Sequence, residues 1–496
     1  MTLPVLTAVT GNWEATLVAG LERSSNDVRV VRRCVDLAEL LSAAAAGLGR
    51  AAVLSADLAR LDREAVAQLQ QSGLAVVGVT DPGDDEAGRR LLNLGIPRVV
   101  SADVGAAELA LVVIGAVENL ARHSPDGGPA DSAPPDLGQA PGGGLARDLG
   151  RAAADPRAGS WGRGPAAVRP SAVPMVAADP ADALARAPSW VSDAVAAHRP
   201  GGRSGRVVAV WGPTGSPGRT TVAVSLAAEF AQRGVPTLLV DADTYGPSVA
   251  QTLGLLDESG GIAGAVRAAN SGALDIHRLA RLAPCVSPTL RVLTGLPQPS
   301  RWPELRPSAL EAVWQCARSL ARWVVIDCGF CLETDEELTF DTSAPRRNGA
   351  TLSALAVADT VLVVGSGDPV GLQRLVRGLS ELNDAFGPAI QRHVVVTRVR
   401  AAAVGSPPER RIADALRRYA EVRDPWFVPD DRSALDEAML AGRMLSEMNP
   451  NSPARRVFSE LAVHLEEQVL ADGLAVADDV LDGPAGLTRA GGHPSR

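Results

Sequence analysis

The sequence predicts an α/β protein with two mostly parallel sheets, each covered by helices on both faces. Two observations lead to this prediction. Short apolar runs alternate with segments whose apolar residues recur at helical spacing, both in residues 1–121 and in residues 206–470. Residues 122–205, between them, are rich in Pro, Gly and Ala and have few large apolar side chains. Strands that alternate with helices favour parallel sheets.

The N-terminal part, residues 1–121, contains five strand–helix repeats. Its predicted strands are the apolar runs 5–11, 27–34, 51–56, 74–80 and 98–102. The segments between and after these runs have apolar residues at helical spacing, often with an acidic residue in the first turn. We expect one (βα)5 domain here.

The remaining chain divides into a linker, a second domain and a tail. Residues 122–205 cannot bury enough apolar surface to offset their ordering entropy, so we expect a disordered linker. Strands of the second domain, 206–470, are predicted at 206–211, 236–243, 291–296, 323–327, 359–366 and 392–399. The Gly- and Pro-containing tail, 471–496, is expected to be flexible.

Composition excludes several classes of protein. The net charge of −9 gives no general attraction to nucleic acid or anionic lipid. No apolar run reaches the roughly 18–20 residues of a membrane helix, and the N-terminus lacks a signal-peptide pattern, so a cytoplasmic protein is expected. Among five cysteines, Cys328 and Cys331 form a C-x-x-C, for which structural free thiols are favoured over a metal or redox site. The chain has no lysine.

The stretch VVAVWGPTGSPGRTTVAVSLAAEF (207–230) places a Gly/Pro loop between an apolar run and a helical pattern. Backbone N–H groups of such a loop, at the positive end of a helix, bind phosphate oxygens, and glycine allows their close approach. Gly215 and Gly218 fit this pattern, and Thr220 stands where a P-loop has its Mg²⁺-binding hydroxyl. Arg219 departs from it, since a P-loop has lysine there. We therefore expect a modified phosphate site in preference to a plain Gly-rich turn.

Two further apolar strands end in carboxylates. Asp241 and Asp243 follow the run TLLV, and Asp327 follows WVVI. Beside a phosphate loop, acids at strand ends hold the Mg²⁺ shell. The alternative is that each Asp caps the turn that follows it. The loop upstream favours the metal interpretation.

The order of these motifs resembles the MinD/ParA family of P-loop ATPases. The likeness covers residues 206–465 and includes LLVDAD, VVID, VADTVLVV and VPDDRSALDEAMLAGRMLSEMNPNSPARRVF. The closest likeness is to the CpaE/TadZ branch, with its actinobacterial septum-site-determining relatives. This resemblance implies an N-terminal receiver-like (βα)5 domain, a disordered linker and a C-terminal P-loop NTPase domain.

The resemblance also implies roles for single residues. The family loop, G-K-G-G-x-G-K-T-T, covers Pro213 to Thr221 and puts the two family lysines on Thr214 and Arg219. The implied ATP-binding residues are Gly215, Ser216, Pro217, Gly218, Arg219, Thr220, Thr221, Thr397 and Arg398. The implied Mg²⁺ residues are Thr220, Asp241 and Asp327. Asp243 falls on the acid that orients the attacking water, so Asp243 and Arg219 are the catalytic candidates. With both lysines replaced, we expect slow or absent hydrolysis.

The receiver-like domain departs from a working receiver. The positions of its acidic pair, phosphorylated Asp and lysine hold Thr10 and Gly11, then Ser55–Ala56 with Asp57 just beyond, then Ser101. Without the acids there is no Mg²⁺ site for phosphoryl transfer. We therefore expect a docking or dimerising module.

In the family, ATP held between two subunits makes a dimer, so a homodimer is expected. Candidate partners are pilus or secretion machinery or division machinery, which would recruit the protein to the cell pole or septum. The last predicted helix, 457–470, is amphipathic but acidic, so direct membrane insertion is not expected. Five arginines lie in segment 408–423, where a solvated face is favoured over nonspecific DNA binding.

Three functions remain open. The first is an ATP-dependent protein that positions a Flp/Tad pilus or secretion apparatus. The second is a non-hydrolysing scaffold that retains the fold. The third is a septum-site or chromosome-partitioning ATPase. Thr220, Asp243 and Asp327 favour the first over the second, whereas the missing lysines favour the second.

Overall fold

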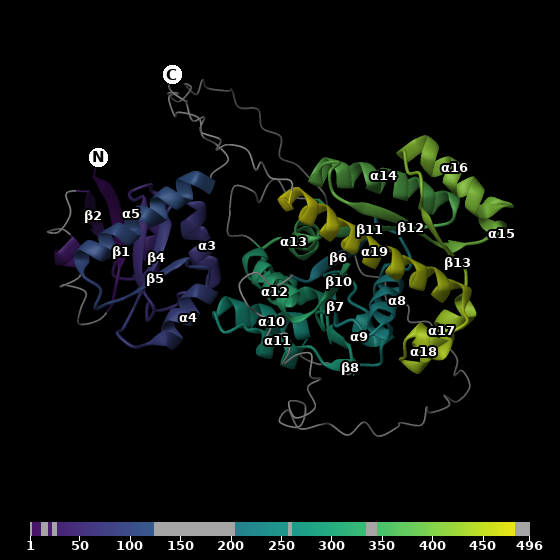
Figure 1. Cartoon of the computed structure of the whole chain (residues 1–496), viewed down its shortest axis with the longest axis horizontal. Helices are drawn as coiled ribbons and strands as arrows, with labels where there is room; N and C mark the ends of the chain where they lie inside the picture. The colour runs from purple at the N-terminus through teal and green to yellow at the C-terminus, as the bar shows by residue number, and fades with distance from the viewer. Residues whose placement is uncertain are drawn as a thin grey trace, which may run out of the picture.

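The structure is a computed structural model of the chain, and it describes residues 2–10, 18–21, 27–123, 204–255, 260–333 and 345–481. It is an α/β structure with two sheets, each layered with helices (Figure 1). Nearly all of the predicted linker, residues 124–203, and the tail from residue 482 onward lie outside the described residues.

The smaller sheet has all five predicted strands, paired in parallel in the order β2-β1-β3-β4-β5. Their bounds are β1 Leu3–Ala8, β2 Val28–Arg33, β3 Ala51–Ser55, β4 Ala75–Thr80 and β5 Arg98–Ser101. Helices α2 (Leu37–Ala45), α3 (Arg63–Gln71) and α4 (Asp85–Asn93) cover one face, and α5 (Ala106–His123) covers the other. This strand order is one of the two common orders of doubly wound sheets.

Aspartates start the three helices on the first face. The carboxylates of Asp36, Asp62 and Asp84 each accept a backbone N–H from the first turn of α2, α3 and α4. Such caps satisfy N–H groups that have no partner within the helix. The helix starts therefore follow directly from the local sequence.

The larger sheet has eight strands in the order β13-β12-β11-β6-β10-β7-β9-β8. Their bounds are β6 Arg206–Trp211, β7 Thr237–Ala242, β8 Cys285–Ser287, β9 Leu290–Leu293, β10 Trp323–Cys328, β11 Thr360–Ser366, β12 Arg392–Val399 and β13 Trp426–Pro429. All neighbours are parallel except β8 and β9. The six predicted strands are present, and the two short edge strands β8 and β13 were not predicted.

Two apolar cores lie on the two faces of this sheet. Alternate residues of β6 point to opposite cores, with Val207 and Ala209 in one and Val208 and Val210 in the other. One core is covered by α10 (Gly261–Asn270), α11 (Ile276–Leu282), α12 (Pro307–Leu320), α13 (Gly349–Val357), α14 (Pro369–Phe386) and α16 (Pro408–Ala420). The other is covered by α8 (Arg219–Gln232), α9 (Val249–Thr252), α17 (Arg432–Ala441), α18 (Leu445–Met448) and α19 (Pro453–Leu481).

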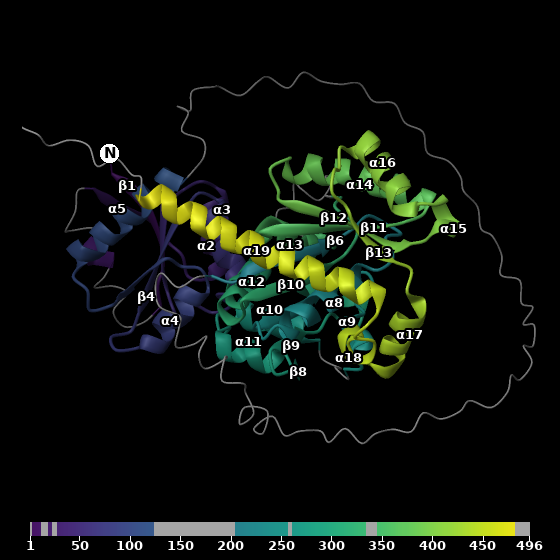
Figure 2. The same cartoon turned by 45° about the vertical axis from the view of Figure 1, so that its right-hand side comes forward.

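The last helix is longer than the sequence suggested. The prediction places it at 457–470, whereas α19 starts at Pro453 and continues to Leu481. It packs along α8 and against β13. Figure 2 shows it crossing the larger unit as one continuous helix. In the described part of the chain no helix is long and apolar enough to cross a membrane.

The two units contact each other through α3 and α4 of the smaller one. The Arg63 guanidinium donates from Nε to the carbonyl of Ser308 at 2.7 Å, and the Ser308 hydroxyl donates to Glu64 at 2.7 Å. Asn93 donates to the carbonyl of Gly272 at 3.0 Å. These polar bonds join α3 and α4 to the start of α12 and the end of α10.

Candidate functional site

The predicted phosphate loop lies at the carboxyl end of β6, a central strand of the larger sheet. Its neighbours are β11 on one side and β10 on the other, and ligands of open α/β sheets bind at such a point. The loop residues Gly215 and Gly218 have φ values of +71° and +99°. Both lie in the left-handed region that favours glycine. Gly218 then precedes the first turn of α8.

Thr397 supports the loop from the neighbouring strand β12. Its buried hydroxyl donates to the carbonyl of Pro217 at 2.8 Å. A Cβ on Gly218 would lie 3.2 Å from the Thr397 methyl carbon, so the loop packs tightly here. The structure thus places Thr397 under the loop, where it holds the backbone, while Arg398 lines the pocket beside it with a φ of +55°.

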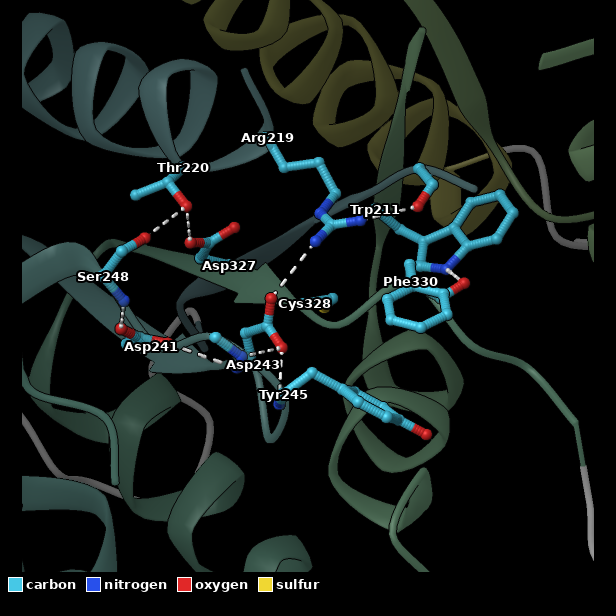
Figure 3. A network of polar contacts seen from close by, with 12 residues as sticks. Trp211, Arg219, Thr220, Asp241, Asp243, Tyr245, Ser248, Asp327, Cys328 and Phe330 are labelled. Carbon is cyan, nitrogen blue, oxygen red and sulfur yellow. Dashed lines mark hydrogen bonds and ion pairs between the residues drawn. The ribbon is translucent and has the colours of Figure 1, made fainter. Parts of the chain in front are cut away.

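Thr220 and Asp327 come together in the first turn of α8 and at the end of β10 (Figure 3). The Thr220 hydroxyl donates to Asp327 Oδ2 at 2.6 Å and lies 3.1 Å from the Ser248 hydroxyl. Asp327 Oδ1 is buried and has no hydrogen-bond partner among the described residues. An orphaned carboxylate oxygen beside a hydroxyl is a donor set that suits a hard cation such as Mg²⁺.

The described residues do not form a complete metal cage. No cluster of three or more His, Cys, Asp or Glu side chains in this part of the chain could hold a metal ion. Mg²⁺ in nucleotide sites is held by one or two protein groups, with phosphates and water completing its shell. Thr220 and Asp327 fit that use, and the metal would supply charge neutralisation between protein and phosphate.

Asp241, on β7, lies opposite Asp327 on the neighbouring strand β10. Its carboxylate accepts hydrogen bonds from the backbone that follows β7. Its Oδ2 accepts the N–H groups of Ser248 at 2.9 Å and Val249 at 3.0 Å, and its Oδ1 accepts that of Asp243 at 3.2 Å. Both oxygens therefore stabilise the turn into α9. Burial raises the pKa of Asp241 to about 7, although these N–H bonds oppose the rise.

Burial and the nearby Asp241 also raise the pKa of Asp327 well above its usual range. The Thr220 hydrogen bond and the Arg219 charge act in the opposite direction. Three carboxylates thus share the carboxyl ends of two adjacent strands, and the local charge balance disfavours ionisation of the two most deeply buried ones.

Arg219 binds Asp243 in this structure. Its Nη2 donates to Asp243 Oδ2 at 3.1 Å and its Nη1 donates to the carbonyl of Gly212 at 3.1 Å (Figure 3). The side chains are 16% and 8% exposed, so the pair is largely screened from water. The charge that a P-loop lysine would bring to the phosphates is here neutralised by an acid of the same site.

Tyr245 follows Asp243 and links it to the segment before α13. The Asp243 carboxylate accepts the N–H of Tyr245 at 2.8 Å, and the Tyr245 hydroxyl donates to Asn348 at 2.7 Å. Arg347 lies over the Tyr245 ring, 4.1 Å from its centroid. The structure thus ties the segment after Asp243 to residues 347 and 348.

A pocket of about 300 Å³ opens beside the helix-side half of the loop. Its lining includes Gly218, Thr221, Thr397, Arg398, Leu435 and Met439. The last two come from α17, a segment to which the sequence prediction assigned no binding role. The sequence signal for these two residues was the motif VPDDRSALDEA, which begins in the last two residues of β13 and continues into α17.

The remaining predicted features have no assigned role in this site. Burial raises the pKa of the Cys328 thiol well above its usual range, which agrees with a structural thiol. In the smaller unit, the Thr10 hydroxyl bonds to Ser55, at 2.8 Å, and to Asp57, so two hydroxyl groups and one carboxylate meet at the ends of β1 and β3. The α16 arginines at 410, 411, 417 and 418 are exposed, with Arg417 paired to Asp414.

Comparisons with known proteins give one family match and several fold likenesses. A family model described as "ParA: NUBPL iron-transfer P-loop NTPase" matches residues 204–271, the segment that carries the loop and both β7 acids. A search of curated proteins finds no match.

Three solved structures illustrate the fold likeness. A ParA family ATPase from Chlorobium tepidum is 18% identical with a TM-score of 0.44, covering 52% of this chain and 99% of its own. The cell division ATPase MinD from Pyrococcus furiosus is 21% identical with a TM-score of 0.42, covering 53% and 99%. The septum site-determining protein MinD from Pyrococcus horikoshii, complexed with Mg-ADP, is 18% identical with a TM-score of 0.41, covering 53% and 97%. At these values the likenesses say nothing about activity.

Proposed function

We propose that the larger unit binds ATP with Mg²⁺ and acts as a MinD/ParA-like positioning protein with weak or no intrinsic hydrolysis. The ParA pattern over residues 204–271 supports the P-loop part of this proposal. The single observation that carries it is the bond of 2.6 Å between Thr220 and Asp327, with the second oxygen of Asp327 left buried and unpartnered. A buried carboxylate oxygen without a partner calls for an explanation, and a bound cation beside Thr220 supplies one.

The shape of the site supports a nucleotide in particular. Phosphates would lie over the backbone N–H groups of Gly215 and of Gly218 to Thr221, at the start of α8. The base and ribose would enter the adjacent pocket, where Leu435 and Met439 offer apolar contact and Arg398 a polar one. The roles of Ser216 and Pro217 are confined to loop backbone, since Ser216 is buried and its N–H closes a turn onto Pro213.

Slow hydrolysis follows from the Arg219–Asp243 pair. In the family pattern, Asp243 orients the attacking water and the residue at 219 reaches the phosphates. Here the two bind each other at 3.1 Å, so each must release the other before it can act. The same pair supports the scaffold alternative, in which nucleotide is held without turnover.

The finer parts of the proposal concern assembly and cargo. We infer a homodimer closed over nucleotide, in the CpaE/TadZ manner, that localises pilus or secretion machinery at a cell pole. Septum-site or chromosome-partitioning cargo is the alternative. The smaller unit would serve as a docking module, because its receiver position holds hydroxyl groups in place of the acids.

Calorimetry with ATP and Mg²⁺ tests the proposal, with phosphate release followed on the same samples. We expect the wild type to bind ATP, Asp327→Ala to lose the Mg²⁺-dependent part, and release to be well below about 1 s⁻¹. Asp275→Asn is the matched control, since Asp275 is an exposed helix cap distant from the loop in the chain. Absence of binding by the wild type would refute the proposal, and rapid release would refute its second half.

A further inference from the structure

Helix α14 packs against the phosphate loop, where Gly378 faces the Pro213 ring and Arg374 faces Gly215. A Cβ on Gly378 would lie 2.8 Å from Pro213 Cγ, so glycine is required for this approach. One turn earlier, the guanidinium of Arg374 lies against Gly215, where an added Cβ would be 1.9 Å from Arg374 Nη1. The start of the helix is secured by Asp368, which accepts the N–H of Gly371 at 2.9 Å.

Arg374 is exposed, and no hydrogen bond or ion pair joins it to another residue in the described part of the chain. Its neighbour on the same helix, Arg377, differs because it pairs with Glu381 at 3.0 Å. A guanidinium that rests on the bare backbone of a phosphate loop has its donors available for an incoming anion.

The arginine of the loop is already engaged, because Arg219 is paired with Asp243 at 3.1 Å. A bound triphosphate would bring several negative charges to the same place. Arginine binds phosphate through two parallel N–H donors, which suits a group that reaches across from a neighbouring helix.

A second arginine near the site, Arg347, is placed differently. Arg347 lies over the Tyr245 ring at 4.1 Å, and its Nε is buried without a hydrogen-bond partner in the described structure. Arg374, by contrast, lies against the loop at Gly215.

We propose that Arg374 binds the terminal phosphates of the nucleotide from within the same chain. In the P-loop pattern a lysine brings positive charge to these phosphates, and this chain has no lysine. Arg374 brings that charge from α14. The inference rests on the proposed nucleotide site and assigns to it a residue outside the loop.

The test compares the affinities of ATP, ADP and AMP, each with Mg²⁺, for the wild type, Arg374→Ala, Arg374→Lys and Arg377→Ala. We expect Arg374→Ala to weaken ATP binding about 10- to 100-fold, the range for one hydrogen-bonded charge. AMP binding should be unchanged, Arg374→Lys should recover part of the loss, and Arg377→Ala should match the wild type.

Two outcomes overturn the inference alone. In one, the wild type binds ATP and Arg374→Ala binds it equally well. In the other, Arg374→Ala weakens ATP, ADP and AMP by the same factor, which would mean a general disturbance of the site. If the wild type binds no nucleotide, the proposed function is wrong and this inference fails with it.

Discussion

Replacing Asp241 with asparagine should stabilise the nucleotide-free protein at pH 8. The carboxyl group is 1% exposed, and burial raises its pKa from 3.8 to about 7. A raised pKa means that the folded state holds the proton more tightly than the unfolded state. Stability from this group is therefore complete below about pH 4 and is lost as pH rises toward 7.

The size of the effect follows from the same values. The difference between 3.8 and about 7 corresponds to roughly 4 kcal/mol of unfolding free energy, at about 1.4 kcal/mol per pH unit. Asparagine avoids this loss but gives up the bond of 3.2 Å to the Asp243 N–H, at a cost of about 1 kcal/mol. Asp241→Asn should thus gain roughly 3 kcal/mol at pH 8 and little at pH 5.

The assay is urea unfolding between pH 5 and pH 8 without nucleotide or Mg²⁺. Tryptophan fluorescence reports on the larger unit, because Trp211, Trp314 and Trp323 are buried there. Asp275→Asn is the control, since Asp275 is an exposed helix cap and asparagine caps equally well. If Asp241→Asn is less stable than the wild type at pH 8, or shows the same pH slope, the reasoning about this carboxyl group is wrong.

Three other changes test the site and the contact between units. Thr220→Ala should weaken Mg²⁺-dependent ATP binding about tenfold or more, because the Thr220 hydroxyl bonds to Asp327 at 2.6 Å. Thr220→Ser keeps the hydroxyl and should retain binding, so equal calorimetric affinities for the two variants would contradict this prediction. Gly218→Ala should lower unfolding free energy by about 1–2 kcal/mol, since its φ is +99°, and an unchanged urea midpoint would refute the strain. Arg63→Ala removes the bond of 2.7 Å to Ser308, so small-angle scattering should show a more extended particle while ATP affinity stays constant; an unchanged profile would mean that other contacts hold the units together.

Much of the fold could be predicted from the sequence, and the reason is periodicity. Strands buried on both faces need continuous apolar runs, which marked β6, β7, β10, β11 and β12 without ambiguity. The edge strands β8 and β13 have three and four residues and carry partly exposed side chains, so they lacked that signal. The predicted last helix, 457–470, was shorter than α19, which ends at Leu481, because the apolar spacing weakens after residue 470.

The candidate site was predictable in position but only partly in its contacts. A loop after β6 and acids after β7 and β10 had to meet, because parallel strands end at one edge of the sheet. The hydrogen-bond and ion-pair partners of each side chain in the site could not be predicted. The sequence did not indicate, for example, that Oδ2 of Asp241, a predicted Mg²⁺ residue, accepts the N–H groups of Ser248 and Val249 at the start of α9. These hydrogen bonds of Asp241 depend on the path of residues 244–248, which brings the start of α9 back to the end of β7.

The sequence by itself determined the two parallel sheets, the place of the phosphate loop and the absence of any lysine to serve it. Tertiary structure alone decided that Arg219 binds Asp243, that α17 lines the pocket and that Arg374 rests on Gly215. The physical reason is range. Strand and helix patterns arise from neighbours along the chain, whereas these contacts join residues that only helix packing across the edge of the sheet brings within reach.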